Sequence, residues 1–304
     1  MIFTHMRPDG DTVGSGIALS RALSLLGIRN EVVNEGDIPE KFRFLAGVDR
    51  ILRAPSLDAE AYICVDASEE ARLGQLAAVY GAGARRKITV NVDHHVSNTR
   101  YAKYNYVCDR SANCENIAAL IRELGVAFDR EIADALMLGL ITDSGSFSHS
   151  DVNGDTFRCA ALAADAGASV DVINRYLFRS QKRAQAELYA RSISHLRYFL
   201  DDTFAVALIP REVMQSLNAT TDMTEGIVDY ALSVDTVQVS ASMLEMKKGQ
   251  YKISLRSKGK INVNQVAATF GGGGHVLASG CMIFGEAEEV MDRLRDAVDR
   301  HREA

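Results

Sequence analysis

The chain has 304 residues and a net charge of −6, with 47% hydrophobic and 24% charged residues. These values are ordinary for a globular protein of about two domains, and no apolar run reaches the roughly 18 residues of a transmembrane helix. The N-terminus lacks the basic and apolar segments of a signal peptide, and the five cysteines form no C-x-x-C pair. We therefore expect a cytoplasmic protein with free thiols, and the negative charge argues against binding of extended duplex DNA.

Short apolar runs alternate with helix-like segments in the first half of the chain. Four runs are predicted as strands: residues 2–4, 31–33, 62–65 and 88–92. Helical spacing of apolar residues predicts three helices: residues 17–26, 71–80 and 115–124. A further apolar segment, residues 133–141, fits either element, and its alanine and leucine content favours a helix. This alternation predicts an α/β domain with a parallel sheet covered on both faces.

The pattern changes after residues 179–199, which are predicted as a helix leading out of the first domain. Three later runs are predicted as strands: residues 204–209, 237–244 and 251–255. A hairpin turn at 247–249 separates the last two, and an amphipathic helix closes the chain at 287–301. We therefore predict a first domain over residues 1–180, a linker helix over 181–200 and a smaller α/β domain over 201–304.

Carboxylates and histidines follow four of the apolar runs, and the most informative group is Asp93-His94-His95 after residues 88–92. In open parallel sheets, ligands bind beyond the carboxyl ends of the strands, so these groups are expected to converge. Several carboxylates in one crevice repel one another unless cations lie between them. Oxygen and imidazole ligands suit Mn²⁺, Mg²⁺, Fe²⁺ or Zn²⁺. The convergent set, sufficient for two ions if one carboxylate bridges, is His5, Asp9, Asp11, Asp66, His94 and Asp143.

Each of these groups also has a purely structural explanation. Asp9 and Asp11 flank Gly10 and could form a turn. Asp66 could be a helix N-cap, and Asp143, which precedes Ser144-Gly145, could be a cap or part of a turn. The occurrence of all four groups at the ends of predicted elements, beside two histidines, favours a metal site.

Together the motifs resemble those of the DHH family of phosphoesterases, in its DHH–DHHA1 subgroup. The four motifs of the catalytic domain are matched in order by His5-x-x-Pro8-Asp9-x-Asp11, Asp66, Asp93-His94-His95 and Gly139-x-x-Thr142-Asp143-Ser144-Gly145-Ser146-Phe147. The signature of the substrate-binding DHHA1 domain is matched by Gly271-Gly272-Gly273-Gly274-His275 and Ala278-Ser279-Gly280. The resemblance implies a parallel-sheet domain and a smaller α/β domain, with the active site in the cleft between them.

The resemblance also implies two divalent metal ions as cofactors, with Mn²⁺ preferred and Mg²⁺ as the alternative. One ion would be held by His5, Asp9 and Asp66, and the other by Asp11, Asp66, His94 and Asp143. Such a pair of ions activates the attacking water, so no serine or cysteine nucleophile is needed. His95 would contact the scissile phosphate, and Asp93 would orient an imidazole.

The substrate-binding residues that the resemblance implies lie mainly in the second half. Backbone amides of the glycine run would form a phosphate nest, His275 would bind the same phosphate or a base, and Arg256 would clamp a phosphate. The full set is Gly272, Gly273, Gly274, His275, Arg256 and, with less support, Arg72. The alternatives are a flexible glycine linker and solvated charges at the two arginines.

The implied function is hydrolysis of short single-stranded oligoribonucleotides to mononucleotides and dephosphorylation of 3′-phosphoadenosine 5′-phosphate. A second enzymatic interpretation is cleavage of cyclic or linear dinucleotides such as cyclic di-adenylate or pApA. A third is a nucleotide-binding regulatory protein without activity, which the retention of all six ligands disfavours. No membrane partner is expected, and a homodimer, the cleavage polarity and the physiological metal stay open.

Two features depart from the family pattern. Members of this size usually have a helix before the first strand, whereas the first motif here begins at His5. We therefore expect that helix to be missing, or the start of the chain to have been set too late. His149, in the loop after the fourth motif, has no close match in the family and is interpreted as a bystander.

Overall fold

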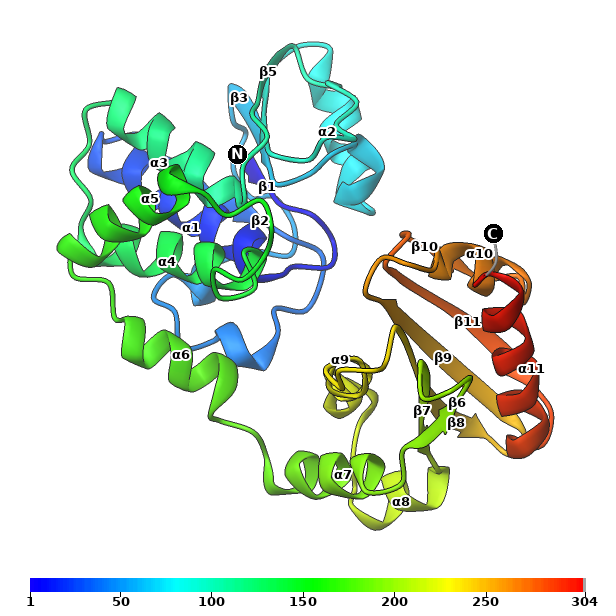
Figure 1. The fold of residues 1–304 in the computed structure, drawn as a ribbon. Coiled ribbons are helices and arrows are strands. Elements are labelled where there is room, and N and C mark those ends of the chain that lie inside the picture. The colour runs from blue at the N-terminus through cyan, green and yellow to red at the C-terminus, as the bar shows by residue number, and fades with distance from the viewer. Residues whose placement is uncertain (303–304) are drawn as a thin grey trace. The chain divides into compact units, whose positions relative to one another are not determined.

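The computed structural model describes residues 1–302, which form two compact units, one over residues 1–180 and one that begins at Gln181 (Figure 1). Each unit has its own sheet and its own hydrophobic core. The predicted α/β class with two sheets is therefore confirmed. Among the described residues, no helix has both the length and the apolar character required to cross a bilayer.

The sheet of the first unit has five parallel strands in the order β2-β1-β3-β4-β5. Their bounds are β1 (Ile2–Phe3), β2 (Val32–Val33), β3 (Ala61–Val65), β4 (Ile88–Asp93) and β5 (Tyr104–Val107). The first four were predicted because they are apolar runs. The edge strand β5 was not, because its tyrosines are partly exposed, with Tyr104 at 55%, and it forms no apolar run.

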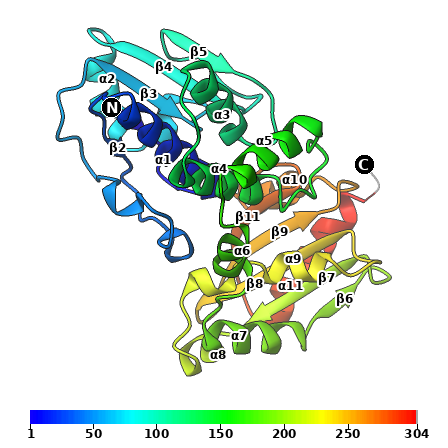
Figure 2. The ribbon, with the colours of Figure 1, turned by 90° about the vertical axis from the view of Figure 1, so that its left-hand side faces the viewer.

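Helices cover both faces of this sheet. Figure 2 shows α1 (Gly10–Leu25), α3 (Asn113–Glu123) and α4 (Arg130–Asp143) over one face, where they form the larger core with Ile2, Val65 and Val92. The short helix η3 (Glu70–Leu73) and α2 (Leu76–Ala84) pack on the other face. The single helix predicted over 71–80 is thus divided, because Gly74 adopts a φ of 62° between the two pieces. Two short 3₁₀ turns and two helices complete the unit: η1 (Glu40–Phe42), η2 (Val48–Arg50), α5 (Gly154–Asp165) and α6 (Val170–Phe178).

Glycines allow α1 and α4 to approach closely. A Cβ added at Gly14 would lie 2.3 Å from the carbonyl oxygen of Ala135, and one at Gly10 would lie 2.3 Å from the Oγ1 of Thr142. A Cβ at Gly139 would lie 2.6 Å from a carboxylate oxygen of Asp11. These contacts leave no room for larger side chains, so the first turn of α1 and the last turn of α4 lie against one another.

The second unit has a six-stranded mixed sheet in the order β10-β11-β9-β8-β7-β6. Its strands are β6 (Arg197–Phe199), β7 (Phe204–Ile209), β8 (Val239–Lys247), β9 (Gln250–Ser257), β10 (Gly273–Gly274) and β11 (Ala278–Phe284). The helices α10 (Val263–Ala268) and α11 (Ala287–Arg300) cover one face. The other face carries α7 (Arg183–Ile193), α8 (Arg211–Ser216), η4 (Thr221–Thr224) and α9 (Ile227–Leu232). Since Leu188 of α7 is buried with Ala207 and Met214, this helix is part of the second unit's core.

Candidate metal centre

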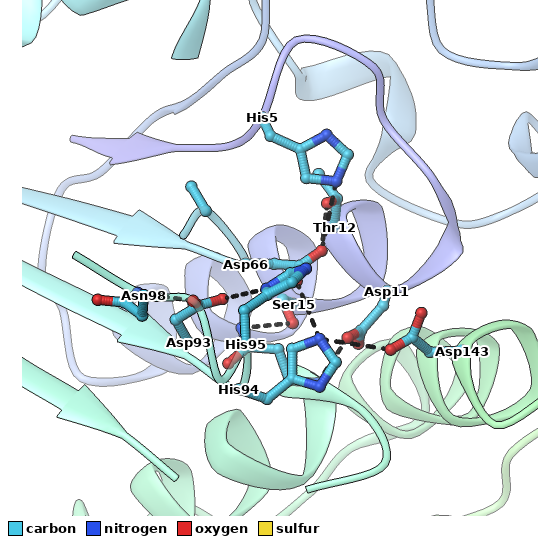
Figure 3. A network of polar contacts seen from close by, with 12 residues as sticks. His5, Asp11, Thr12, Ser15, Asp66, Asp93, His94, His95, Asn98 and Asp143 are labelled. Carbon is cyan, nitrogen blue, oxygen red and sulfur yellow. Dashed lines mark hydrogen bonds and ion pairs between the residues drawn. The ribbon is translucent and has the colours of Figure 1, made fainter. Parts of the chain in front are cut away.

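The six predicted metal ligands come from four places in the first unit and converge. Figure 3 labels five of them: His5, Asp11, Asp66, His94 and Asp143. His5 follows β1, Asp66 follows β3 and His94 follows β4. Asp9 and Asp11 lie at the start of α1, and Asp143 is the last residue of α4. Asp143 is therefore placed by the end of a helix. The other three groups begin at or after the carboxyl ends of β1, β3 and β4, as the parallel-sheet argument predicts.

Asp66 lies at the centre of this group. One of its oxygens, Oδ2, is 3.5 Å from Nε2 of His5, which is also 3.4 Å from Oδ2 of Asp9. The other, Oδ1, is 3.5 Å from Nε2 of His94, which is 3.4 Å from Oδ2 of Asp143. Each oxygen of Asp66 thus faces a different histidine and a different second carboxylate.

The backbone at Asp66 is in the left-handed region, with a φ of 53°. A non-glycine residue in this region stores strain, which is common at functional sites. Its side chain is 2% exposed and accepts a hydrogen bond from the hydroxyl of Thr12. Asp66 therefore does not cap a helix, and Thr12 is a site residue that the sequence did not indicate.

Asp9 also has a structural role, but it is a helix N-cap and not the turn considered for it, and it occupies one oxygen only. Its Oδ1 caps α1 by accepting from the backbone N–H of Thr12 at 2.9 Å, while its Oδ2 faces His5. Asp11 is fully buried, and both of its oxygens accept from backbone amides at the start of α3. Asn113 donates to Oδ2 at 2.5 Å and Cys114 to Oδ1 at 2.9 Å. These two amides hold the Asp11 carboxylate in place.

The charges of the cluster shift one another's protonation. Burial opposes the charged forms of both histidines, but their contacts with the carboxylates raise the pKa of His5 to about 9 and that of His94 to about 11. Against its own burial, the ion-pair contacts with His5 and His94 at 3.5 Å hold the pKa of Asp66 well below its usual range. Burial and then the neighbouring negative charge raise the pKa of Asp11 to about 7 and of Asp143 to about 8. The crowded carboxylates thus need positive charge between them.

Several buried polar atoms of this cluster have no hydrogen-bond partner. They are both ring nitrogens of His5 and Oδ1 of Asp66. Buried polar atoms are nearly always satisfied, so such orphans indicate a missing ligand. A hydrogen bond orients His94 for a ligand. Its Nδ1 lies 2.9 Å from the carbonyl oxygen of Arg110 and donates to it. That contact leaves Nε2 as the nitrogen that can lose its proton to a metal, and the oxygen and imidazole ligand atoms together fit a divalent cation.

Asp93 and His95 form a pair at the edge of the cluster, where Nδ1 of His95 is also 3.7 Å from Oδ1 of Asp66 and groups with Asp66 and His94. Asp93 is fully buried, and its Oδ1 accepts from Nδ1 of His95 at 2.8 Å. Its Oδ2 accepts from the side-chain amide of Asn98 at 2.6 Å, and the amide of Asn116 donates to its carbonyl oxygen at 3.0 Å. His95 is thereby oriented with Nε2 left over. The sequence identified the pair but not the two asparagines, whose role depends on the fold.

The glycine run of the second unit is the first arm of a hairpin. The amides of Gly271 and Gly272 donate to Ala268 and Ala267 at the end of α10, so they are already engaged. Gly273 and Gly274 are exposed and pair with Gly280 and Ser279 of β11. The run is therefore not a flexible linker, and exposed amide backbone is left only in its second half.

His275 and Arg256 lie near this hairpin within the second unit. The backbone of His275 exchanges hydrogen bonds with Ala278 at 2.8 and 3.2 Å, which makes a two-residue turn and leaves the imidazole exposed. Arg256 in β9 is paired with Ala278 in the sheet register. Its Nε is 3.2 Å from Oδ1 of Asp229, and one terminal nitrogen donates to the carbonyl oxygen of Leu255. Arg72 lies in η3 of the first unit, where its carbonyl oxygen accepts from the N–H of Met6.

Comparison with known proteins matches both halves of the chain. The model of the DHH family N-terminal domain matches residues 1–140, and that of the DHHA1 domain matches residues 201–302. The bifunctional oligoribonuclease and PAP phosphatase NrnA of Thermus thermophilus is 28% identical, over 98% of this chain and 88% of the relative. The cyclic-di-AMP phosphodiesterase GdpP of Bacillus subtilis is 24% identical, over 70% of this chain and 32% of its own length. An exopolyphosphatase-related protein of Bacteroides fragilis has the same fold, with a TM-score of 0.90, 24% identity and coverage of 99% and 92%.

Proposed function

The chain carries a DHH-family N-terminal domain followed by a DHHA1 domain, and from this premise we propose a specific function. It is a metal-dependent phosphoesterase that hydrolyses short oligoribonucleotides to mononucleotides and dephosphorylates 3′-phosphoadenosine 5′-phosphate. The observation that carries the proposal is the convergence of His5, Asp66, His94 and their carboxylate neighbours, with buried polar atoms that lack a hydrogen-bond partner among them. Relatives that carry both activities in their names match almost the whole chain.

Two divalent ions would be held by the two halves of the cluster. His5, Asp9 and Asp66 form one group of candidate ligands, and Asp11, His94 and Asp143 form another. Asp66 faces both groups, so we assign it as the bridge. When bound, the ions supply a water nucleophile of lowered pKa and polarise the phosphoryl oxygens. We propose Mn²⁺ as the metal and Mg²⁺ as the alternative.

The remaining residues of the first unit would orient the phosphate and handle protons. The contact with Asp93 fixes the proton of His95 on Nδ1, and Asn98 holds Asp93 in place. As an imidazolium, whose Nδ1 proton goes to Asp93, His95 would donate its Nε2 proton to a phosphate oxygen or to the leaving oxygen. We propose His95 as the phosphate contact and Asp93 as the residue that orients it.

We further propose that the second unit binds the part of the substrate that is not cleaved. Exposed Gly273 and Gly274 offer backbone close to His275, with no Cβ to block a phosphate. Arg256 would contribute a planar guanidinium for a phosphate oxygen. Its contact with Asp229 engages Nε and leaves a terminal nitrogen for the ligand. Arg72 is a weaker candidate, because its only described role is a backbone contact.

A second candidate function is hydrolysis of cyclic or linear dinucleotides, and the match to a cyclic-di-AMP phosphodiesterase supports it. The two candidates share the same metal chemistry and differ in the substrate. A non-catalytic nucleotide-binding role is disfavoured by the presence of all six ligand side chains. The unpaired thiols of all five cysteines support a reducing compartment, and we propose the cytoplasm.

A substrate panel with Mn²⁺ tests this proposal. Dinucleotides to pentanucleotides, 3′-phosphoadenosine 5′-phosphate, cyclic di-adenylate and pyrophosphate would be compared by kcat/KM, each with and without chelator. The proposal expects the short oligoribonucleotides and the bisphosphate to be cleaved. A marked preference for the cyclic dinucleotide would support the second candidate, and no metal-dependent hydrolysis of any nucleotide would refute both.

A further inference from the structure

The carbonyl groups at the end of α4 are all satisfied, and the last one by a histidine side chain. A helix ends with four carbonyl oxygens that have no partner inside the helix. The first three are bonded within the following turn, as Ser144 donates to Leu140, Ser146 to Ile141 and Gly145 to Thr142. The fourth belongs to Asp143, and Nδ1 of His149 lies 2.9 Å from it.

An unusual turn brings His149 back to the helix end. Gly145, Ser146 and Phe147 have φ values of 57°, 59° and 65°, so three successive residues are left-handed. The imidazole lies over the first of them, since a Cβ at Gly145 would be 2.4 Å from its Nε2. Left-handed conformations are costly for serine and phenylalanine, so the surrounding contacts must hold the turn in place.

The hydrogen bond fixes the state of this histidine. A carbonyl oxygen only accepts, so Nδ1 of His149 carries the proton and donates it. His94 is held in the same way by the carbonyl oxygen of Arg110 at 2.9 Å. His149 differs in that it contacts the backbone of a candidate metal ligand. That residue is Asp143, whose carboxylate lies 3.4 Å from Nε2 of His94.

Histidines close other helices of this chain, and they supply the comparison. Nδ1 of His195 lies 3.0 Å from the carbonyl oxygen of Arg191 in α7, and Nδ1 of His301 lies 2.7 Å from that of Ala297 in α11. Both are ordinary helix C-terminal contacts, which stabilise a helix modestly. Neither carbonyl belongs to a residue of the metal cluster.

We propose that His149 is a positioning residue for Asp143. Its hydrogen bond and its ring fix the last residue of α4, and so they keep the Asp143 carboxylate directed at His94. This inference rests on the proposed metal centre and deepens it, because it assigns a role to a residue that the sequence presented as a bystander.

Two substitutions separate the hydrogen bond from the packing of the ring. His149→Phe keeps a ring over Gly145 but removes the donor, whereas His149→Asn removes the ring but places an amide N–H near the position of Nδ1. His301→Phe is the matched control, since it removes the same kind of contact at a helix end far along the chain. All three and the wild type would be titrated with Mn²⁺, with free Mn²⁺ measured by electron paramagnetic resonance.

We expect the Mn²⁺ affinities of the two sites to respond differently to these substitutions. His149→Phe should weaken one site by about 10-fold and leave the other unchanged, as is usual when a residue behind a ligand is lost. His149→Asn should retain near wild-type affinity, and His301→Phe should lower thermal stability without changing either site. Wild-type affinities in His149→Phe, or equal losses in His149→Phe and His301→Phe, would overturn the proposal. Failure of the wild-type protein itself to bind Mn²⁺ would instead refute the proposed function.

Discussion

Substitution of Gly139 by alanine tests whether the close packing of helices α1 and α4 determines the position of Asp11 in the cluster. A Cβ at this position would lie 2.6 Å from Oδ1 of Asp11, 3.1 Å from its Cα and 2.3 Å from Sγ of Cys114. Ordinary van der Waals contact begins at 3.4 Å, so the Asp11 oxygen must move by about 0.8 Å. Asp11 has little freedom to do so, because the amides of Asn113 and Cys114 hold both of its oxygens.

The expected loss of stability is small, and the expected loss of activity is large. Overpacking of a core costs about 1–3 kcal/mol, and alanine regains about 1 kcal/mol over glycine inside a helix. Gly139→Ala should therefore be destabilised by at most about 2 kcal/mol, or about 4–8 °C in Tm. A displacement of nearly 1 Å at a reacting site can cost about 100-fold in rate, so kcat/KM should fall by about that factor.

The assay is Mn²⁺-dependent hydrolysis of a dinucleotide, measured beside thermal unfolding. Gly83→Ala is the matched control, because Gly83 also lies in a helix and its added Cβ would be 2.3 Å from the ring of Tyr62, on the opposite face of the sheet. It should lose stability but keep its activity. If Gly139→Ala were destabilised like the control and still hydrolysed the dinucleotide at the wild-type rate, the assignment of Asp11 to the site would be wrong.

Three other outcomes are expected. Asp66→Asn keeps a side chain that tolerates the left-handed backbone but removes the negative charge between the two candidate metal sites. The variant should therefore fold and lose Mn²⁺-dependent hydrolysis, and retained activity would contradict the two-metal assignment. The raised pKa values of His5, about 9, and His94, about 11, mean that both stay protonated below those pH values, so metal must displace their protons. Asp11 and Asp143, with pKa values raised to about 7 and about 8, add further protons. Calorimetry in two buffers of different ionisation enthalpy should then show release of more than two protons near pH 7, and a buffer-independent enthalpy would argue against these ligands. His275→Ala should raise KM with little effect on kcat, because it lies in the second unit; a loss confined to kcat would place it at the chemistry.

Most of the first unit's architecture could be predicted because its strands are buried on both faces. Such strands appear in the sequence as short apolar runs, as at residues 62–65 and 88–92, and β3 and β4 lie there. The edge strand β5 has only one neighbour and partly exposed tyrosines, so it carries no such signal. The division of the helix at residues 71–80 depended on a left-handed Gly74, and a glycine is also tolerated inside a helix.

The candidate ligands could be predicted, but the groups that hold them could not. Asp66 and His94 stand in short motifs whose residue types are unusual after an apolar run. Thr12, Asn98 and the amide of Asn113 are ordinary polar groups. The contacts of Thr12 and Asn113 join segments far apart in the chain, and that of Asn98 with Asp93 depends on the local course of the loop after β4. Backbone amides in particular have no sequence signature, so the support for Asp11 became visible only with α3 in place.

The orphaned nitrogens of His5 and the buried oxygen of Asp66 have a consequence for the abundance of the protein. Atoms that are desolvated without a partner lower the stability of the metal-free fold by roughly 1–3 kcal/mol each. An ion that binds only the folded chain restores this loss, and a free concentration of about 100 times its Kd adds about 2.7 kcal/mol. The lifetime of the polypeptide, and not only its activity, would then follow the supply of the metal.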